Sequence, residues 1–327
     1  MTKLTKEFSK SARLEEVLAR INRAIEPIDI HRPQFPKYPL LLIFGCPRSG
    51  TTVFMQWLAS LGCFGYPSNL IARFYGNPAF GCDVQKVLID LDKENQLGLA
   101  DIGVNYTSSL GRTKGALAPS EFWYYWRRFF KFDDVQRLSE SELNSVDLDS
   151  FLYGLGAMEH AIGKPLVMKG MLLNWNIPLL NSISDNFIYV SIKRDLSDIA
   201  KSILLCRERY TGSREHWWSF RPPGYRQWLK LRPAEQVALQ AYHTQAAVDQ
   251  GMLSVHRGRS LEVSYESFCN APQEIYEKLK TIYRRNGFVI PEKYEGAKKF
   301  NMNSNNDIDS ESSRLIQLTL EKQITKK

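Results

Sequence analysis

A short loop in this chain has the side chains and the position needed to bind an anion: Arg48, Ser49, Gly50, Thr51 and Thr52. It follows the apolar run 41–44, and Gly45 and Gly50 have the G-x-x-x-x-G spacing of a phosphate-binding loop. Backbone N–H groups at the start of the following helix would point at the anion, and the helix dipole adds about 0.3–2 kcal/mol. The hydroxyls and the planar guanidinium suit a phosphate or a sulfate.

The loop lacks the lysine that a nucleotide triphosphatase carries after the second glycine, because Thr51 occupies that position. The basic residue is Arg48, inside the loop. We therefore expect an anionic ligand that is not bound as ATP with Mg²⁺. The alternative is a strand-turn-helix corner with incidental small residues, which does not explain an arginine beside Ser-Gly-Thr-Thr.

A second set of anion-binding residues follows the apolar run 186–192, which predicts another buried strand. Arg194 comes directly after it, and Asp195 is suited to cap a helix over residues 196–208. Ser202 lies eight residues beyond Arg194, about two turns into that helix. Alone, the pair could be a surface salt bridge and a solvated serine; with the first loop it predicts a second phosphate contact.

The two motifs resemble those of the sulfotransferases that use PAPS (3′-phosphoadenosine 5′-phosphosulfate). In that family [K/R]-S-G-[T/S]-[T/S] follows the first strand and binds the 5′-phosphosulfate, and a strand-end arginine and a helical serine bind the 3′-phosphate. This chain has Leu196 where the family usually has proline. The resemblance implies PAPS as sulfuryl donor, no required metal, and a donor site made of Arg48, Ser49, Gly50, Thr51, Thr52, Arg194, Ser202 and Tyr265.

Tyr265 enters this set through a weaker resemblance. Residues 261–268 resemble the last core strand of the family, whose tyrosine often contacts the adenine. Tyr265 could equally belong to the core. A helix should follow, with Asn270 as its N-cap, Pro272 in its first turn and Gly287 as its stop.

Sulfuryl transfer needs a positioned cation and a base for the acceptor hydroxyl. The resemblance implies that Arg48 contacts both the 5′-phosphate and the sulfate. It also implies that Lys169, at the end of the run 165–169, points at the bridging oxygen, although a strand-end lysine is often only a solvated cap. Catalytic roles are therefore predicted for Arg48 and Lys169.

The base is harder to assign. Met171 stands where some family branches have a histidine, and residues 66–69 lack the glutamate of the protein-tyrosine branch. Glu121, a carboxylate among aromatic residues, is our candidate; its alternative role is a first-turn charge after Pro119. Three histidines remain as other candidates: His160, His216 and His243.

The acceptor is predicted from two aromatic segments. Residues 207–233 form an insertion that combines aromatic and basic side chains, and residues 122–128 could form the opposite wall, although continuous aromatics in a helix are often core. A carbohydrate or glycolipid hydroxyl is the first expectation, with a small phenol or a lipid alcohol as the competitor. The aromatics of the insertion are Trp217, Trp218, Phe220, Tyr225 and Trp228.

The elements that must hold these residues alternate between strands and helices. Strands are expected at 40–44, 165–169, 187–193 and 261–265, separated by long helical stretches. This pattern predicts an α/β protein with a parallel sheet and helices on both faces, and the family resemblance implies the three-layer, P-loop NTPase-like sulfotransferase fold. We expect one domain, 1–327, with an N-terminal helix and entry segment at 1–38 and a last helix at about 310–322.

Composition limits the remaining classes of function. The net charge of +8 suits a polyanionic donor, and the cations are dispersed with no nucleic-acid motif. The five cysteines have no metal-type spacing, and neither a signal peptide nor a membrane span is evident, so a cytoplasmic enzyme is expected. A P-loop small-molecule kinase and a non-catalytic basic binding module are the alternatives. Oligomeric state cannot be inferred from the sequence.

Overall fold

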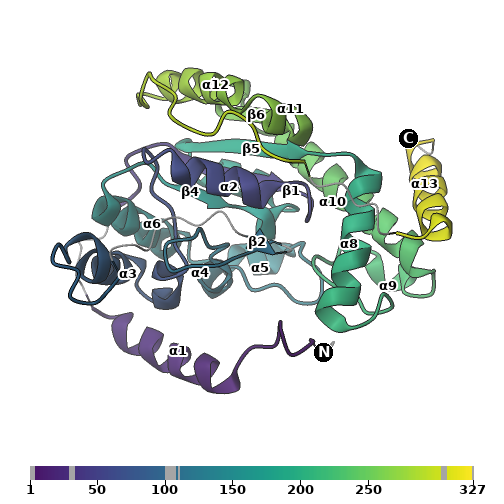
Figure 1. The fold of residues 1–327 in the computed structure, drawn as a ribbon, viewed down its shortest axis with the longest axis horizontal. Helices are drawn as coiled ribbons and strands as arrows, with labels where there is room; N and C mark the ends of the chain where they lie inside the picture. The colour runs from purple at the N-terminus through teal and green to yellow at the C-terminus, as the bar shows by residue number, and fades with distance from the viewer. Residues whose placement is uncertain (1–3, 29–33, 100–107, 110, 303–307, 326–327) are drawn as a thin grey trace.

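A four-stranded parallel sheet lies at the centre of the protein, in the order β4-β1-β5-β6 (Figure 1). The computed structural model describes residues 4–28, 34–99, 108–109, 111–302 and 308–325. The strands are β1 (Leu40–Gly45), β4 (Val167–Lys169), β5 (Phe187–Lys193) and β6 (Ser260–Ser264). The predicted parallel α/β sheet is therefore confirmed.

The strands bury side chains on both faces, and alternate residues therefore enter two different cores. Leu41 and Ile43 pack with α2 (Thr51–Ser60) and α12 (Pro272–Arg285) on one face. Leu42 and Phe44 pack on the other face with α4 (Trp123–Phe129), α6 (Leu148–Ile162) and α7 (Ile177–Ile183). Helices thus cover both faces, which gives the three layers.

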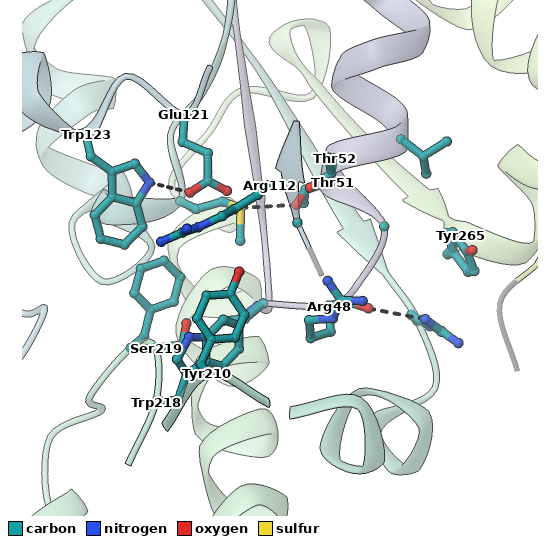
Figure 2. Close-up of a pocket in the computed structure, with 17 residues that line it drawn as sticks. Arg48, Thr51, Thr52, Arg112, Glu121, Trp123, Tyr210, Trp218, Ser219 and Tyr265 are labelled. Atoms are coloured by element: carbon teal, nitrogen blue, oxygen red, sulfur yellow. Dashed lines mark hydrogen bonds between the residues drawn. The ribbon is translucent and has the colours of Figure 1, made fainter. Parts of the chain in front are cut away.

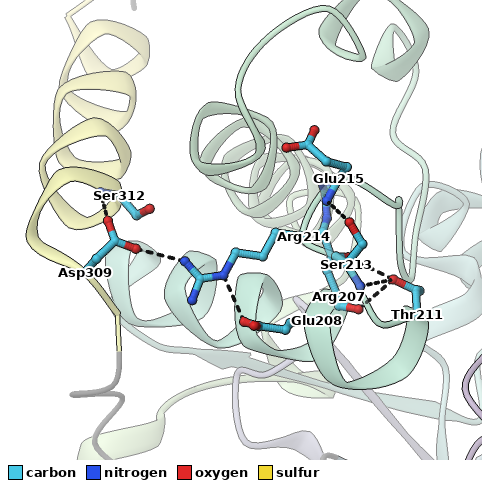
Figure 3. A network of polar contacts seen from close by, with 8 residues as sticks. All are labelled: Arg207, Glu208, Thr211, Ser213, Arg214, Glu215, Asp309 and Ser312. Carbon is cyan, nitrogen blue, oxygen red and sulfur yellow. Dashed lines mark hydrogen bonds and ion pairs between the residues drawn. The ribbon is translucent and has the colours of Figure 1, made fainter.

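A third core joins the helices beyond β5. It contains Ile199 and Ile203 from α8 (Leu196–Thr211), Val237 from α10 (Pro233–Met252) and Ile316 from α13 (Ser310–Ile324). Figure 3 shows the polar link at its edge, where the Arg214 guanidinium lies between the carboxylates of Glu208, at 2.9 Å, and Asp309, at 2.8 Å. Asp309 also caps α13 by accepting from the backbone N–H of Ser312.

One predicted boundary is wrong. Asn270 was expected to cap the helix that follows the last strand, but it ends a short helix, α11 (Tyr265–Asn270). The reason is that the Ser264 hydroxyl caps α11 directly after β6, by accepting from Ser267 N–H at 3.3 Å. Helix α12 then begins at Pro272 without a side-chain cap.

The N-terminal helix α1 (Ala12–Ile25) packs against η1 (Ile71–Phe74) at the lower edge of Figure 1. Leu18 and Ile25 of this helix are buried, whereas Leu14 is exposed. No helix among the described residues is both long and apolar enough to cross a membrane. The remaining elements are α3 (Pro78–Gln85), η2 (Lys86–Asp90), β2 (Ser108–Ser109), β3 (Arg112–Thr113), α5 (Glu140–Asn144), η3 (Met171–Leu173), α9 (Tyr225–Trp228) and η4 (Arg257–Arg259).

Candidate active site

All four strands deliver predicted site residues to the same edge of the sheet. Gly45 ends β1, Lys169 ends β4, Arg194 follows β5, and Tyr265 follows β6. Because the strands are parallel, their carboxyl ends meet at one edge, where α/β proteins bind ligands. The register brings these ends together: Ile43 lies opposite Lys169, Gly45 opposite Ile192, and Lys193 opposite Ser264.

The loop between β1 and α2 turns through backbone conformations that side chains rarely adopt. Gly50 has φ of 99°, and Arg48 has φ of 72° although it carries a side chain. A Cβ on Gly50 would lie 2.2 Å from Cδ2 of Tyr265, so the Tyr265 ring lies directly against the loop backbone. Glycine at position 50 is therefore needed both for its φ and for this close contact.

Ser49 gives the loop a buried hydroxyl that is available to an anion. Its side chain is fully buried, and its Oγ has no hydrogen-bond partner among the described residues. A buried hydroxyl without a partner is costly and rare, and an anionic ligand would give it one. Since Ser49 lies at the N-terminal end of α2, its environment agrees with the binding of a phosphate or a sulfate.

The two predicted phosphate motifs are in direct contact. Arg48 Nε donates to Ser202 Oγ at 2.9 Å, and Arg194 Nη1 donates to the backbone oxygen of Arg48 at 3.3 Å. The guanidinium of Arg194 lies 4.7 Å from the centre of the Tyr265 ring, in a cation–π contact, and 3.5 Å from Asp198. Two arginines, a serine and the loop backbone therefore converge from β1, β5 and α8.

Lys169 and Glu121 form an ion pair beside the loop. Lys169 Nζ lies 2.9 Å from Glu121 Oε1 and donates to Thr52 Oγ1 at 2.8 Å. Lys169 is only 6% exposed, whereas Glu121 is about one-third exposed and also accepts from Trp123 Nε1. The partly exposed carboxylate of Glu121 can exchange a proton with a ligand. The ammonium of Lys169 beside it can stabilise negative charge.

The three histidines considered as bases lie elsewhere. Neither cavity at the site is lined by His160, His216 or His243. His160 is in the last turn of α6, and His216 is exposed. His243 stacks on Trp228 at 4.8 Å, and burial lowers its pKa.

Two cavities meet at the ion pair. The first, of about 320 Å³, extends from Arg194 and Tyr265 along the loop to Glu121 and Trp123 (Figure 2). The second, of about 940 Å³, opens on the far side of the pair. Both are lined by Thr52, Gly111, Arg112 and Glu121. The site therefore has two compartments joined beside Lys169.

The aromatic segments divide between core and cavity. Trp123, Trp218 and Phe220 line the first cavity, and the rings of Trp123 and Phe220 are stacked 5.9 Å apart. The other aromatics of residues 122–126 and 217–228 are mostly structural. Phe122, Tyr125, Trp126, Trp217 and Tyr225 are buried, and Trp228 packs on His243.

A buried arginine fixes the segment that carries Trp218 and Phe220. Arg207 is fully buried and donates to Gln236 Oε1 at 2.7 Å and to Gln240 Oε1 at 3.3 Å, with its guanidinium 4.6 Å from the Trp217 ring. Gln240 in turn donates to the backbone oxygens of the two cavity residues at 2.9 and 2.7 Å. Burial lowers the pKa of Arg207 to about 9. The aromatic wall is therefore anchored to α8 and α10.

Sequence reasoning missed Arg112, which lines both cavities. It comes from β3, and its guanidinium donates to the backbone oxygen of Phe8 at 3.1 Å and lies over the rings of Phe8 and Tyr210. The rings of Phe8 and Tyr210 are in contact, tilted by 31° with their centres 3.8 Å apart. No sequence pattern marks this arginine, because its partners come from the N-terminal segment and from α8.

Comparison with known proteins identifies the fold. No protein-family model and no curated protein matches the sequence. Among solved structures, the sulfotransferase STF9 from Mycobacterium avium is similar with a TM-score of 0.55 at 12% identity, covering 99% of this chain and 86% of that chain. STF1 from Mycobacterium tuberculosis H37Rv, also a sulfotransferase, has a TM-score of 0.54 at 13% identity, with coverage of 98% and 87%. The chain therefore has the sulfotransferase fold, as its two phosphate motifs predicted.

Proposed function

We propose that this protein is an O-sulfotransferase that uses PAPS and releases 3′,5′-ADP (PAP). The observation that carries the proposal is the convergence of two phosphate motifs in one cavity. Arg48 donates to Ser202 at 2.9 Å, and Arg194 donates to the backbone oxygen of Arg48 at 3.3 Å. Arg48 and Arg194 line the cavity that extends to Glu121. An elongated ligand with an anionic group at each of two places fits this arrangement better than a single phosphate does.

The donor fits the residues that are present. Arg194 and Ser202 would hold the 3′-phosphate, the Tyr265 ring would face the adenosine, and the loop from Arg48 to Thr52 would hold the phosphosulfate. The buried hydroxyl of Ser49, which has no partner among the described residues, would gain one. PAPS, when bound, supplies the sulfuryl group; the chain supplies the charges and the positioning.

The Lys169–Glu121 pair is assigned the proton and charge chemistry. Glu121, the more exposed partner, would accept the proton of the acceptor hydroxyl. Lys169 and Arg48 would stabilise the negative charge that develops on the leaving phosphate oxygen, and low exposure strengthens the effect of Lys169. Thr52, bonded to the ammonium at 2.8 Å, keeps Lys169 aimed at the loop.

We propose a carbohydrate hydroxyl as the acceptor. The stacked rings of Trp123 and Phe220, with Trp218 in the same cavity, suit the apolar face of a sugar. Arg112 and the carboxylate of Glu121 provide the polar partners that a sugar also requires. A small phenol would use the rings but has only one hydroxyl to offer these polar groups, whereas a sugar has several, which favours the sugar.

Thermal stabilisation by PAP tests the donor assignment. The melting temperature is measured with PAP, with ATP and Mg²⁺, and with inorganic sulfate. At about 100 times its dissociation constant, PAP should add roughly 2.7 kcal/mol without Mg²⁺. Arg194→Ala should lose this shift, and Arg285→Ala, an exposed arginine at the end of α12, serves as the control.

The other outcomes separate the alternatives. A shift with ATP and Mg²⁺ but not with PAP would indicate a kinase. The absence of a shift with any of the three ligands would leave a non-catalytic basic module. A PAP shift that survives in Arg194→Ala would refute the role given to Arg194.

A further inference from the structure

The second cavity carries positive charge that no acidic residue in the described part of the chain neutralises. Its lining includes Arg73, Arg112 and Lys114, all exposed, and none of the three forms an ion pair within the described part of the chain. Exposed cations usually belong to a dispersed, solvated surface. Here three of them line one cavity that ends at the proposed catalytic pair.

The other charges of this cavity are already compensated. Lys10 pairs with Glu15 at 3.6 Å, and the hydroxyl of Tyr124 donates to the same carboxylate at 2.6 Å. Lys169 and Glu121 neutralise each other at 2.9 Å. The excess charge therefore comes from the three unpaired cations, and it favours an anionic group in the cavity.

The elements that carry Arg73 and Lys114 are fixed to each other. Asn69, just before η1, donates through its side chain to the backbone oxygen of Thr113 at 3.3 Å and to that of Gly115 at 3.0 Å. Leu70 N–H donates to Ala116 O at 2.9 Å. The segments that carry the two cations are thus held together by hydrogen bonds. This reduces the entropy cost of ordering the cations around a ligand.

We propose that Arg73 and Lys114 select an acceptor that carries a carboxylate in addition to the hydroxyl that is sulfated. The inference rests on the proposed function, since it assigns the second cavity to the part of the acceptor that extends beyond the sulfated hydroxyl. The hydroxyl would lie beside Glu121 and Lys169, where the two cavities meet, and the carboxylate would extend toward η1 and the loop after β3. With a sugar as acceptor, the class is an acidic carbohydrate.

Matched pairs of hydroxylated acids and their neutral amides test this selectivity. Glucuronate, hydroxymethylbenzoate and hydroxyhexanoate are each compared with the corresponding amide, and binding to the PAP-saturated protein is measured by calorimetry. We expect at least one acid to bind about tenfold more tightly than its amide, the effect of two exposed ion pairs. Raising the salt concentration should reduce this preference.

The variant Arg73→Ala/Lys114→Ala should bind the acid and the amide equally, with the amide bound as in the wild type. The control is Lys278→Ala/Arg285→Ala, which removes the same two residue types from exposed positions on α12. In Figure 1 this helix lies at the edge opposite α1. The control should keep the preference.

Two results would overturn the inference. One is a wild type that binds none of the acids more tightly than its amide; the other is a preference that survives in the double variant. Binding of PAP is measured in the same series. If PAP does not bind, the proposed function fails; if PAP binds and the acid preference is absent, only the assignment of the second cavity fails.

Discussion

Replacement of Gly50 by alanine tests whether the loop conformation depends on contact with Tyr265. An alanine at φ of 99° costs roughly 1–2 kcal/mol, because its Cβ crowds the backbone. Its Cβ would also lie 2.2 Å from Cδ2 and 2.7 Å from Cε2 of the Tyr265 ring. Overpacking of this kind costs about 1–3 kcal/mol. Gly50→Ala should therefore lower the free energy of unfolding by about 2–5 kcal/mol.

The ligand site should change together with stability. The Tyr265 ring that must move also supports the guanidinium of Arg194 at 4.7 Å. We expect the affinity for PAP to fall about tenfold, the value of a partly desolvated cation–π contact. The assays are urea denaturation for the free energy of unfolding and calorimetry for PAP.

Two comparisons isolate the contact from the backbone effect. Gly62→Ala has a similar positive φ of 70° but meets no atom within 4 Å, so it should cost only the backbone part. In a Tyr265→Ala background, Gly50→Ala should also lose its steric part. Two results would refute this explanation. One is a loss of unfolding free energy in Gly50→Ala no greater than that in Gly62→Ala; the other is a loss in Gly50→Ala that stays the same in the Tyr265→Ala background.

Two further predictions concern catalysis and acid stability. Glu121→Gln should lower kcat by roughly 10²–10⁴-fold while leaving PAP affinity unchanged, because it removes the proposed base and keeps the shape of the side chain. Steady-state kinetics and PAP calorimetry measure the two effects. An unchanged kcat would eliminate Glu121 as the base. The backbone N–H and hydroxyl of Ser312 and the guanidinium of Arg214 lower the pKa of Asp309 to about 2, from an ordinary value of 3.8. Since the folded-state pKa is the lower one, the stabilisation is present above about pH 4 and is lost as the pH falls toward 2. Urea denaturation should therefore show wild type more stable than Asp309→Asn at pH 5, with the difference shrinking at pH 2–3; a difference that does not change with pH would contradict the assignment.

Local sequence patterns predicted the residues of the proposed donor site. The apolar runs before Arg48 and Arg194, the glycine spacing and the Asp195 cap are all encoded within a few residues, and β1, β5 and the start of α8 lie where these patterns predict. The sheet is parallel because long helical stretches separate its strands. Helix α11 was missed, since Ser264 caps it without the break that a strand-to-helix connection usually shows.

Tertiary structure alone decided the position of the Lys169–Glu121 pair and the lining of the second cavity. Lys169 and Glu121 are 48 residues apart in the chain and meet only because β4 lies at the edge of the sheet beside β1. Arg112, Arg73 and Lys114 carry no periodicity or motif, and they line one cavity because η1 and the loop after β3 are hydrogen-bonded together. Short-range patterns encode caps, turns and buried faces, whereas the order of strands and the docking of loops depend on packing between distant segments. The sequence could therefore predict the residues of the proposed anion site, and only the fold could bring the proposed catalytic pair and the second cavity beside them.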